Sequence, residues 1–459
     1  MKNLFILFLL VVIAVALTGV WLSRDGQLST PVGAGTTTLD AGEFESFPLP
    51  AYAAAHLEMP FQSYFVEVAP GIKVHVLEAG TGYPVYLQHG NPTSGFLYRK
   101  VAQALPLDRV RVIMPTMVGL GFSSKVPASQ HTLDNHVAWM AEVLDQLGLE
   151  EAVYVGQDWG GPVGMGALAL RPGVLQGAVV MNTGFNAPTE AADLSPAHAR
   201  VKTPVVGELL LEGLVSIFDQ LHNMQGDAGS ISADVAELYG KPVRDSGNSK
   251  APLALMRMVP DGPDHPSAER MRFIEQYVAG LEVPVELVWG MKDPILASGL
   301  PAMRANFPDA PVIETRGGHF LQEEVPEVIA GAIMRLVEEI EAPPASDRVL
   351  FSYVLEARHA QDDVTTSEFG FLVDFDRRAT ADIGGTARLE MHAQDEGDVV
   401  NAHLTLHGYV DGEATPVGET RIRVPFGGRE TVSWPGQPAY TLTIAAKRQP
   451  PPADDSTRI

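Results

Sequence analysis

Short apolar runs and helical patterns alternate along the middle of the chain, and this alternation narrows the possible folds more than any other feature. Residues 85–90, 109–114, 153–156, 179–181 and 285–289 are short apolar runs typical of buried strands. Apolar residues recur at helical spacing in about 133–147, 161–170 and 324–340. Strands that alternate with helices predict an α/β fold with a mostly parallel sheet covered on both faces. The 46% of hydrophobic residues can supply its core.

The interval between residue 184 and about residue 280 interrupts the alternation. It is rich in Met and Leu, has a helical pattern and contains no obvious buried strand. An insertion of this kind between two sheet strands would lie over their carboxyl ends, where open α/β sheets bind ligands. We therefore expect a helical cap at about 185–265.

The length of 459 residues predicts two folded units with additional segments. The α/β domain is expected at 59–341, followed by a proline-bearing linker at 342–349. Period-two stretches separated by Gly and Asp turns then predict an all-β, sandwich-like domain at 350–447. Residues 25–58, rich in Gly, Thr, Ser and Pro, are predicted to be a linker. Residues 448–459 are predicted to be a disordered tail.

The N-terminus carries the one targeting signal. Lys2 is followed by an apolar run from Leu4 to Leu22, with small residues at Ala14 and Ala16. This pattern fits a secretory signal peptide over residues 1–24, and the run is also long enough for an uncleaved membrane anchor. Both alternatives predict an exported enzyme, periplasmic or extracellular, and the anchor would bring residues 4–22 into contact with a membrane.

Composition excludes several classes of function. A formal net charge of −24 argues against a nucleic-acid partner, which requires a basic surface. The absence of cysteine excludes disulfides, cysteine-ligated zinc, thiol catalysis and a lipoprotein anchor. No metal site and no cofactor are predicted.

A candidate nucleophile stands between a buried strand and a helix. Gly156-Gln157-Asp158-Trp159-Gly160 occupies the place where an α/β hydrolase holds its nucleophile on a strained turn, and glycines let the backbone come close. The residue in the nucleophile position is Asp158. A carboxylate attacks saturated carbon and gives an ester, which water then hydrolyses.

Two further residues complete a candidate triad. His319, in Gly317-Gly318-His319-Phe320, precedes the last helix and follows the nucleophile and the acid in the chain order of this fold. It would activate water against the ester. Asp293 ends an earlier strand and would orient the imidazole. The competing acid position, at the end of the preceding strand, holds Asn182, so we assign the acid to Asp293.

The loop after an early strand supplies the remaining candidate. His89-Gly90-Asn91-Pro92-Thr93-Ser94 stands where this fold places the second backbone donor of its oxyanion hole. The backbone N–H groups of Asn91 and Trp159 are therefore expected to stabilise the oxyanion that forms during ester hydrolysis.

At this point the chain resembles the haloalkane dehalogenases over about residues 60–340. The motifs that carry the resemblance are the two just described around Asn91 and Asp158, Val118-Gly119-Leu120-Gly121-Phe122-Ser123, Gly318-His319-Phe320-Leu321-Gln322-Glu323, and the cap segments 239–242 and 258–263. The resemblance implies a small apolar halogenated substrate, with water as co-substrate and halide as product. It also implies that Asn91 and Trp159 donate hydrogen bonds to the halide, as in the branch of the family that combines an aspartate acid with Asn and Trp donors.

Two other functions remain as alternatives. Epoxide hydrolases use the same Asp and His machinery, but they usually have two cap tyrosines that protonate the epoxide oxygen. This chain has only Tyr239 between residues 185 and 263. The second alternative is a non-catalytic envelope binding protein on a hydrolase scaffold, and the complete set of Asp158, Asp293 and His319 counts against it.

Overall fold

The computed structural model describes residues 10, 13–15, 17–191, 196–341, 348–359, 363–375, 377–383, 386–410, 413–436 and 438–449. The chain forms two compact units, Met1–Glu341 and Ala342–Ile459, which are described separately. Most of the predicted linker at 342–349 and most of the predicted tail at 448–459 lie outside the described residues. Much of the predicted targeting segment at 1–24 also lies outside the described residues. Within the described residues, no helix is both long enough and apolar enough to cross a membrane.

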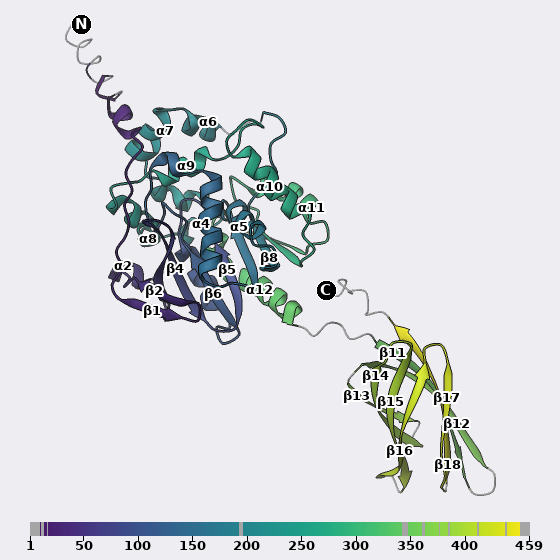
Figure 1. Cartoon of the computed structure of the whole chain (residues 1–459). Helices are drawn as coiled ribbons and strands as arrows, with labels where there is room; N and C mark the ends of the chain where they lie inside the picture. Colours follow the sequence, from purple (N-terminus) through teal and green to yellow (C-terminus); the bar gives the residue numbers. More distant parts are fainter. Residues whose placement is uncertain are drawn as a thin grey trace. The chain divides into compact units, whose positions relative to one another are not determined.

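A ten-stranded sheet organises the first unit (Figure 1). Its strands are β1 (Thr36–Leu39), β2 (Gly42–Ser46), β3 (Gln62–Ala69), β4 (Ile72–Gly80), β5 (Tyr83–Gln88), β6 (Val110–Pro115), β7 (Ala152–Gln157), β8 (Leu175–Met181), β9 (Val285–Gly290) and β10 (Val312–Thr315). Their order is β1-β2-β3-β4-β6-β5-β7-β8-β9-β10. Strands β5 to β10 run parallel to one another, whereas β1 to β4 pair antiparallel and β4 joins β6 in the same antiparallel way.

The parallel strands lie between two layers of helices, which is why they are almost entirely apolar. Helices α4 (Leu133–Gln146), α5 (Gly160–Ala169) and α10 (Ala268–Ala279) pack together, and so do α3 (Arg99–Ala104) and α12 (Pro326–Glu341). Every residue of β7 and β9 is buried. The predicted α/β-hydrolase fold is confirmed.

The prediction of a linker at 25–58 is wrong from Thr36 onward. Strands β1 and β2 form a hairpin, and β2 pairs with β3 through Glu45 and Ser46. Helix α2 (Ala51–Ala54) follows. The hairpin lies at the sheet edge, and Phe44 is its only buried residue. Such a strand therefore carries almost no hydrophobic pattern for a sequence to display.

The insertion between β8 and β9 is helical, as predicted. It contains α6 (Pro196–Lys202), α7 (Val206–Glu208), the π-helix η3 (Leu209–Leu214), the 3₁₀ helices η4 (Ile217–Met224) and η5 (Ala228–Ser230), then α8 (Ala233–Asp245) and α9 (Ala251–Arg257). Helix α10 closes the insertion but belongs to the core layer, because Ile274 packs against Gly166 of α5. The cap therefore ends before α10 begins at Ala268.

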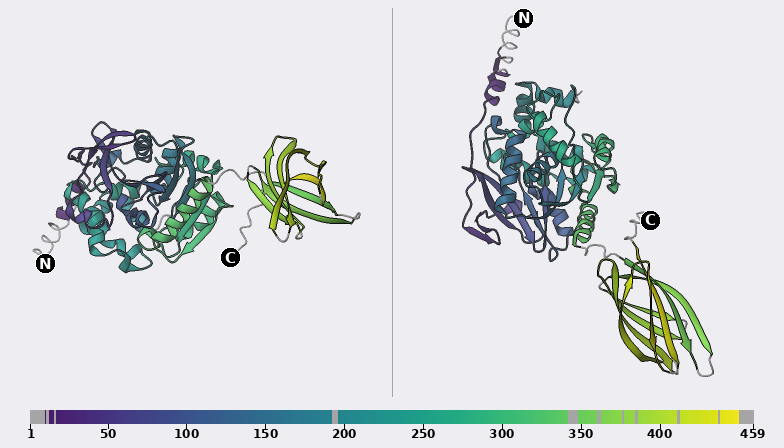
Figure 2. Two further views of the ribbon diagram at one scale, coloured as in Figure 1. Left: turned by 90° about the horizontal axis from the view of Figure 1, so that it is seen from below. Right: turned by 45° about the vertical axis from the view of Figure 1, so that its right-hand side comes forward.

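The second unit is a β-sandwich (Figure 2). One antiparallel sheet has the order β12-β11-β18-β17, and the other has the order β13-β14-β15-β16. The strands are β11 (Arg348–Arg358), β12 (Val364–Asp374), β13 (Arg378–Ile383), β14 (Ala387–Asp395), β15 (Val399–Val410), β16 (Glu413–Pro425), β17 (Arg429–Trp434) and β18 (Ala439–Gln449). Phe351 and Leu404, one from each sheet, are fully buried in a single shared core. The predicted all-β unit is confirmed, and its last strand continues two residues past the predicted end at 447.

Candidate active site

Asp158 stands on a strained turn between β7 and α5. Its φ is +52°, a left-handed conformation that an aspartate tolerates better than most residues. The surrounding backbone comes so close that side chains do not fit. A Cβ on Gly160 would lie 2.1 Å from the carbonyl oxygen of Gln88, and one on Gly90 would lie 2.4 Å from the Cβ of Asp158. The turn lifts the carboxylate above the end of the sheet.

Hydrogen bonds from two loops hold the elbow and its carboxylate. The N–H of Asp158 donates to the carbonyl of Asn182 at 3.0 Å, and the hydroxyl of Thr183 donates to the carbonyl of Asp158 at 2.6 Å. The N–H of Asn91 donates to Oδ1 of Asp158 at 2.8 Å. The backbone N–H of Trp159 lies close enough to the same carboxylate to lower its pKa. Both predicted oxyanion-hole donors therefore meet at the candidate nucleophile.

His319 faces the other oxygen of that carboxylate. Its Nε2 lies 3.8 Å from Oδ2 of Asp158, and its Nδ1 lies 2.9 Å from Oδ2 of Asp293. The side chains of His319 and Asp293 are almost completely buried. The structure thus places His319 between the carboxylates of Asp158 and Asp293, although the three residues lie far apart in the sequence.

Asp293 is held by more than the imidazole. Its Oδ1 accepts from the N–H groups of Ile295 at 2.7 Å and Leu296 at 3.1 Å. Its Oδ2 also accepts from Nδ2 of Asn182 at 2.9 Å. Asn182 in turn exchanges hydrogen bonds with the backbone of Gly290, which ties the ends of β8 and β9 together. The carboxylate is therefore fixed in position and kept ionised.

Burial and charge move the pKa values of the triad in different directions. Burial raises the pKa of Asp158, and the charge of His319 and the N–H groups of Trp159 and Asn91 only partly oppose it. For Asp293, burial also acts upward, but the His319 bond and the two N–H groups outweigh it and lower the pKa. For His319, burial acts downward, but the hydrogen bond to Asp293 and the two carboxylate charges raise the pKa above its ordinary value.

An apolar cavity of about 120 Å³ opens over the carboxylate. It is lined by Asn91, Pro92, Asp158, Trp159, His198, Ile217, Gln220, Leu221, Met224, Met256, Val259, Ile295, His319 and Phe320. Trp159 is nearly buried, and its indole N–H donates to no acceptor among the described residues. The side-chain amide of Asn91 donates one hydrogen bond to the carbonyl of Pro252 in the cap at 3.1 Å.

Three further polar residues of the site make contacts that the sequence does not predict. His198, from α6, lines the cavity, and burial lowers its pKa against the opposing charge of Asp158. Gln157 donates to the carbonyl of His319 at 3.0 Å and so positions the histidine loop. Asn182, considered above only as an alternative acid position, supports Asp293 instead. Only the packed structure shows these contacts.

Tyr239, the one tyrosine considered for an epoxide hydrolase, does not line this cavity. Its hydroxyl donates to Oε1 of Glu323 at 2.7 Å and accepts from Arg99 at 3.2 Å. Arg99 and Glu323 form a buried bidentate ion pair, with N···O distances of 2.6 and 2.9 Å. Tyr239 therefore belongs to a structural network that joins α3, α8 and the segment after His319.

Comparisons with known proteins agree with this fold. Residues 83–204 match the family model described as alpha/beta hydrolase fold. The chain is 32% identical over 282 residues to haloalkane dehalogenase 2 of Mycobacterium tuberculosis, covering 60% of this chain and 94% of that protein. It is 29% identical to a cis-3-alkyl-4-alkyloxetan-2-one decarboxylase of Shewanella oneidensis, covering 62% and 90%.

Solved structures show the same similarity in three dimensions. The haloalkane dehalogenase DatA from Agrobacterium tumefaciens is similar with a TM-score of 0.56 at 24% identity, covering 63% of this chain and 100% of that one. The epoxide hydrolase CorEH is similar with a TM-score of 0.51 at 18% identity, covering 61% and 100%. At these identities the two structures support the fold alone.

Proposed function

The chain belongs to the haloalkane dehalogenase family of α/β hydrolases, and we propose that it hydrolyses haloalkanes to an alcohol and a halide through an ester on Asp158. One observation carries the proposal. A carboxylate, and not a serine hydroxyl, occupies the nucleophile position, in contact with a complete His319–Asp293 pair and facing an apolar cavity. A carboxylate in that position displaces a leaving group from carbon and needs a histidine only for the second step.

In the first step, Oδ2 of Asp158 attacks the carbon that carries the halogen. A carbon–oxygen bond forms while the carbon–halogen bond breaks, and the halide leaves with the electron pair. We assign the indole N–H of Trp159 and the free amide N–H of Asn91 as halide donors, because weak neutral donors suit a halide in a dry pocket. The contact with Pro252 supports this role for Asn91 because it fixes the amide plane.

In the second step, Nε2 of His319 takes a proton from water, and the resulting hydroxide attacks Cγ of the Asp158 ester. The negative charge develops on Oδ1, where the N–H groups of Asn91 and Trp159 stabilise it. The bond between Cγ and the alkyl oxygen then breaks, and His319 returns the proton to the alcohol. The regenerated carboxyl group releases one proton to solvent. Asp293 stabilises the imidazolium throughout.

The acid at Asp293 together with Asn91 and Trp159 favours the branch of the family with an aspartate acid and Asn/Trp donors. For location we propose export across a membrane, on the strength of Lys2 and the apolar run from Leu4 to Leu22.

The two steps are expected to differ in their pH dependence. The second step requires neutral His319, and the pKa of His319 is raised above 6.5. Steady-state halide release should therefore decline as the pH falls through this raised pKa. The first step requires only ionised Asp158, so a single equivalent of halide per enzyme should still form at mildly acidic pH, with the ester accumulating. Single-turnover and steady-state halide release measured from pH 5 to 9 test this expectation. Two profiles that fall together would contradict the assignment of His319 to the second step alone.

Substrate class is tested by halide release from brominated and chlorinated alkanes, with styrene oxide hydrolysis measured in parallel. We expect bromide release and little epoxide hydrolysis, because Tyr239 points away from the cavity. A Tyr239→Phe variant is the matched control. It should keep its bromide release, whereas in an epoxide hydrolase that used this tyrosine it would lose epoxide opening. Epoxide hydrolysis without any halide release would replace the dehalogenase proposal with the alternative.

A further inference from the structure

The end of the N-terminal helix packs on the cap. Residues 17–22 are helical, and Gly19 is buried against α7 and η3. A Cβ on Gly19 would lie 2.5 Å from Cγ1 of Val205 and 3.3 Å from Leu209, so the N-terminal helix and the cap are in close contact at Gly19. The Nζ of Lys250, at the start of α9, donates to the carbonyl of Leu22. The apolar N-terminal run and the cap therefore meet at a defined place, beside α7 in Figure 1.

The outer side of this junction is apolar and exposed. Trp21 is 61% exposed, whereas the other four tryptophans of the chain are at most 7% exposed. Val20 and Val206 are also exposed, and Leu209 and Leu210 are half-buried. A single exposed tryptophan in the last turn of an apolar run, followed by Arg24, is the arrangement that anchors a helix end at a membrane surface.

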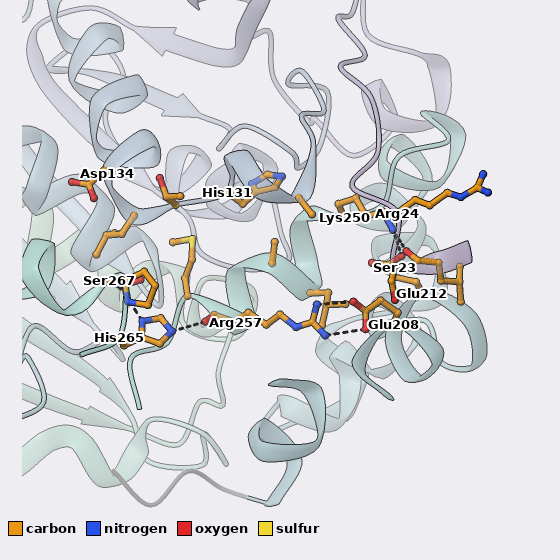
Figure 3. Close-up of a pocket in the computed structure, with 18 residues that line it drawn as sticks. Ser23, Arg24, His131, Asp134, Glu208, Glu212, Lys250, Arg257, His265 and Ser267 are labelled. Atoms are coloured by element: carbon orange, nitrogen blue, oxygen red, sulfur yellow. Dashed lines mark hydrogen bonds and ion pairs between the residues drawn. The ribbon is translucent and has the colours of Figure 1, made fainter. Parts of the chain in front are cut away.

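The inner side of the junction is polar. Glu208 and Glu212 lie one helical turn apart and pair with Arg257 and Lys250 (Figure 3). These pairs line a cavity of about 380 Å³ between the cap, the start of α4 and residues 22–24. The segment 205–215 thus pairs its charges with the protein, while Val206 and Val215 are exposed. This is the pattern of a helix that lies in a membrane interface.

We propose that the N-terminal helix is retained in the membrane and that the cap segment 205–215, through Val206 and its apolar neighbours, lies in the interface of the bilayer beside it. The run from Leu4 to Leu22 would span about 28 Å as a helix, close to the thickness of the hydrocarbon core. Gly19 lies about one turn inside the end of that run. Because Val205 and Leu209 contact Gly19, they reach the same depth as its last turn.

This placement has a consequence for substrate access, which rests on the proposed function. A second cavity of about 330 Å³ beside η3 has one wall of Leu211, Val215 and Ile217, and its other lining residues include the charged Glu212, Asp219 and Arg244. Ile217 also lines the catalytic cavity. An apolar haloalkane concentrates in the bilayer, so this cavity would lead it from the lipid past Ile217 to Asp158.

The chain has no cysteine, so single cysteines can be labelled without interference. The full chain is reconstituted in phosphatidylcholine vesicles with an environment-sensitive fluorophore on a Val206→Cys variant. A Glu150→Cys variant is the matched control, because Glu150 is exposed at the opposite, amino end of the strands. Nitroxide-labelled lipids should quench Trp21 and the label at position 206, and should leave the label at position 150 unchanged.

Quenching of Trp21 without quenching at position 206 would show that the cap stands clear of the bilayer and would overturn the proposal. Absence of Trp21 quenching would overturn it as well, as would an intact mass showing removal of residues 1–16 from the membrane-isolated chain.

Activity on the same vesicles tests the access route. A Val206→Glu variant should release halide at the wild-type rate from a short, water-soluble bromoalkane and several-fold more slowly from a long bromoalkane supplied in vesicles. Equal rates on the vesicle-borne substrate would overturn the route. If the wild type releases no halide from either substrate, the proposed function fails, while the quenching result still stands.

Discussion

Asp158→Asn is expected to lower halide release by about 10⁴-fold or more, the size of effect seen when a nucleophile is removed from a hydrolase site. The amide is neutral and a poor nucleophile, so no ester forms. The variant should fold normally. Asparagine tolerates the left-handed conformation of residue 158, and its side chain has the same shape. Halide release measured beside the thermal unfolding midpoint checks both expectations.

The comparison with Asp158→Ala separates the chemistry from the backbone strain of the turn. Both variants should be inactive. Alanine at φ +52° should additionally cost about 1–2 kcal/mol of stability and lower the unfolding midpoint. An Asp158→Asn protein that keeps more than about one hundredth of the wild-type rate would be incompatible with covalent catalysis by Asp158, because only direct attack by water could then explain the turnover.

His319→Gln is expected to stop the reaction after the first step. Glutamine has no basic nitrogen, so water is not activated, while Asp158 still attacks the substrate. The variant should release one equivalent of halide per enzyme and then halt, with turnover lower by about 10⁴-fold. The alkyl group should appear as added mass on the peptide that contains Asp158. Rapid-quench halide measurement and peptide mass spectrometry detect the two products.

Two controls define this result. The double variant Asp158→Asn, His319→Gln should show neither the initial equivalent of halide nor the added mass. Gln157→Ala should keep both steps with a slower second step, because the Gln157 amide contacts the carbonyl and Nε2 of His319 but is not the base that activates water. Normal turnover by His319→Gln would refute the mechanism, and added mass on another residue would move the nucleophile away from Asp158.

The proximity of Asp158, His319 and Asp293 could be predicted because each follows a strand end of a parallel sheet, and such ends meet at one edge. Their roles remain predictions that the variants above test. The position of His198 could not be predicted. It depends on how α6 packs over the sheet, and cap packing is decided by contacts between residues distant in sequence.

The fold also contains parts that the sequence predicts and parts that it does not. Strands β5 to β9 are buried on both faces and are visible in the sequence as apolar runs, whereas the edge hairpin β1–β2 buries only Phe44 and has the sequence pattern of a linker. The sandwich unit was predictable because its strands bury alternate residues against a single core. The fold of the first unit could be predicted only when this periodicity was combined with the motifs around Asn91, Asp158 and His319.

Asn182 has a consequence for how such a site can change during evolution. It touches the same carboxylate oxygen of Asp293 that bonds the imidazole, from a neighbouring strand. An Asn182→Asp replacement would bring two carboxylates together, and they would share a proton instead of both ionising. A later Asp293→Asn replacement would relieve that conflict and leave the acid on the other strand. Two substitutions could thus move the acid from the end of β9 to the end of β8, while the histidine, the nucleophile and the sheet stay in place.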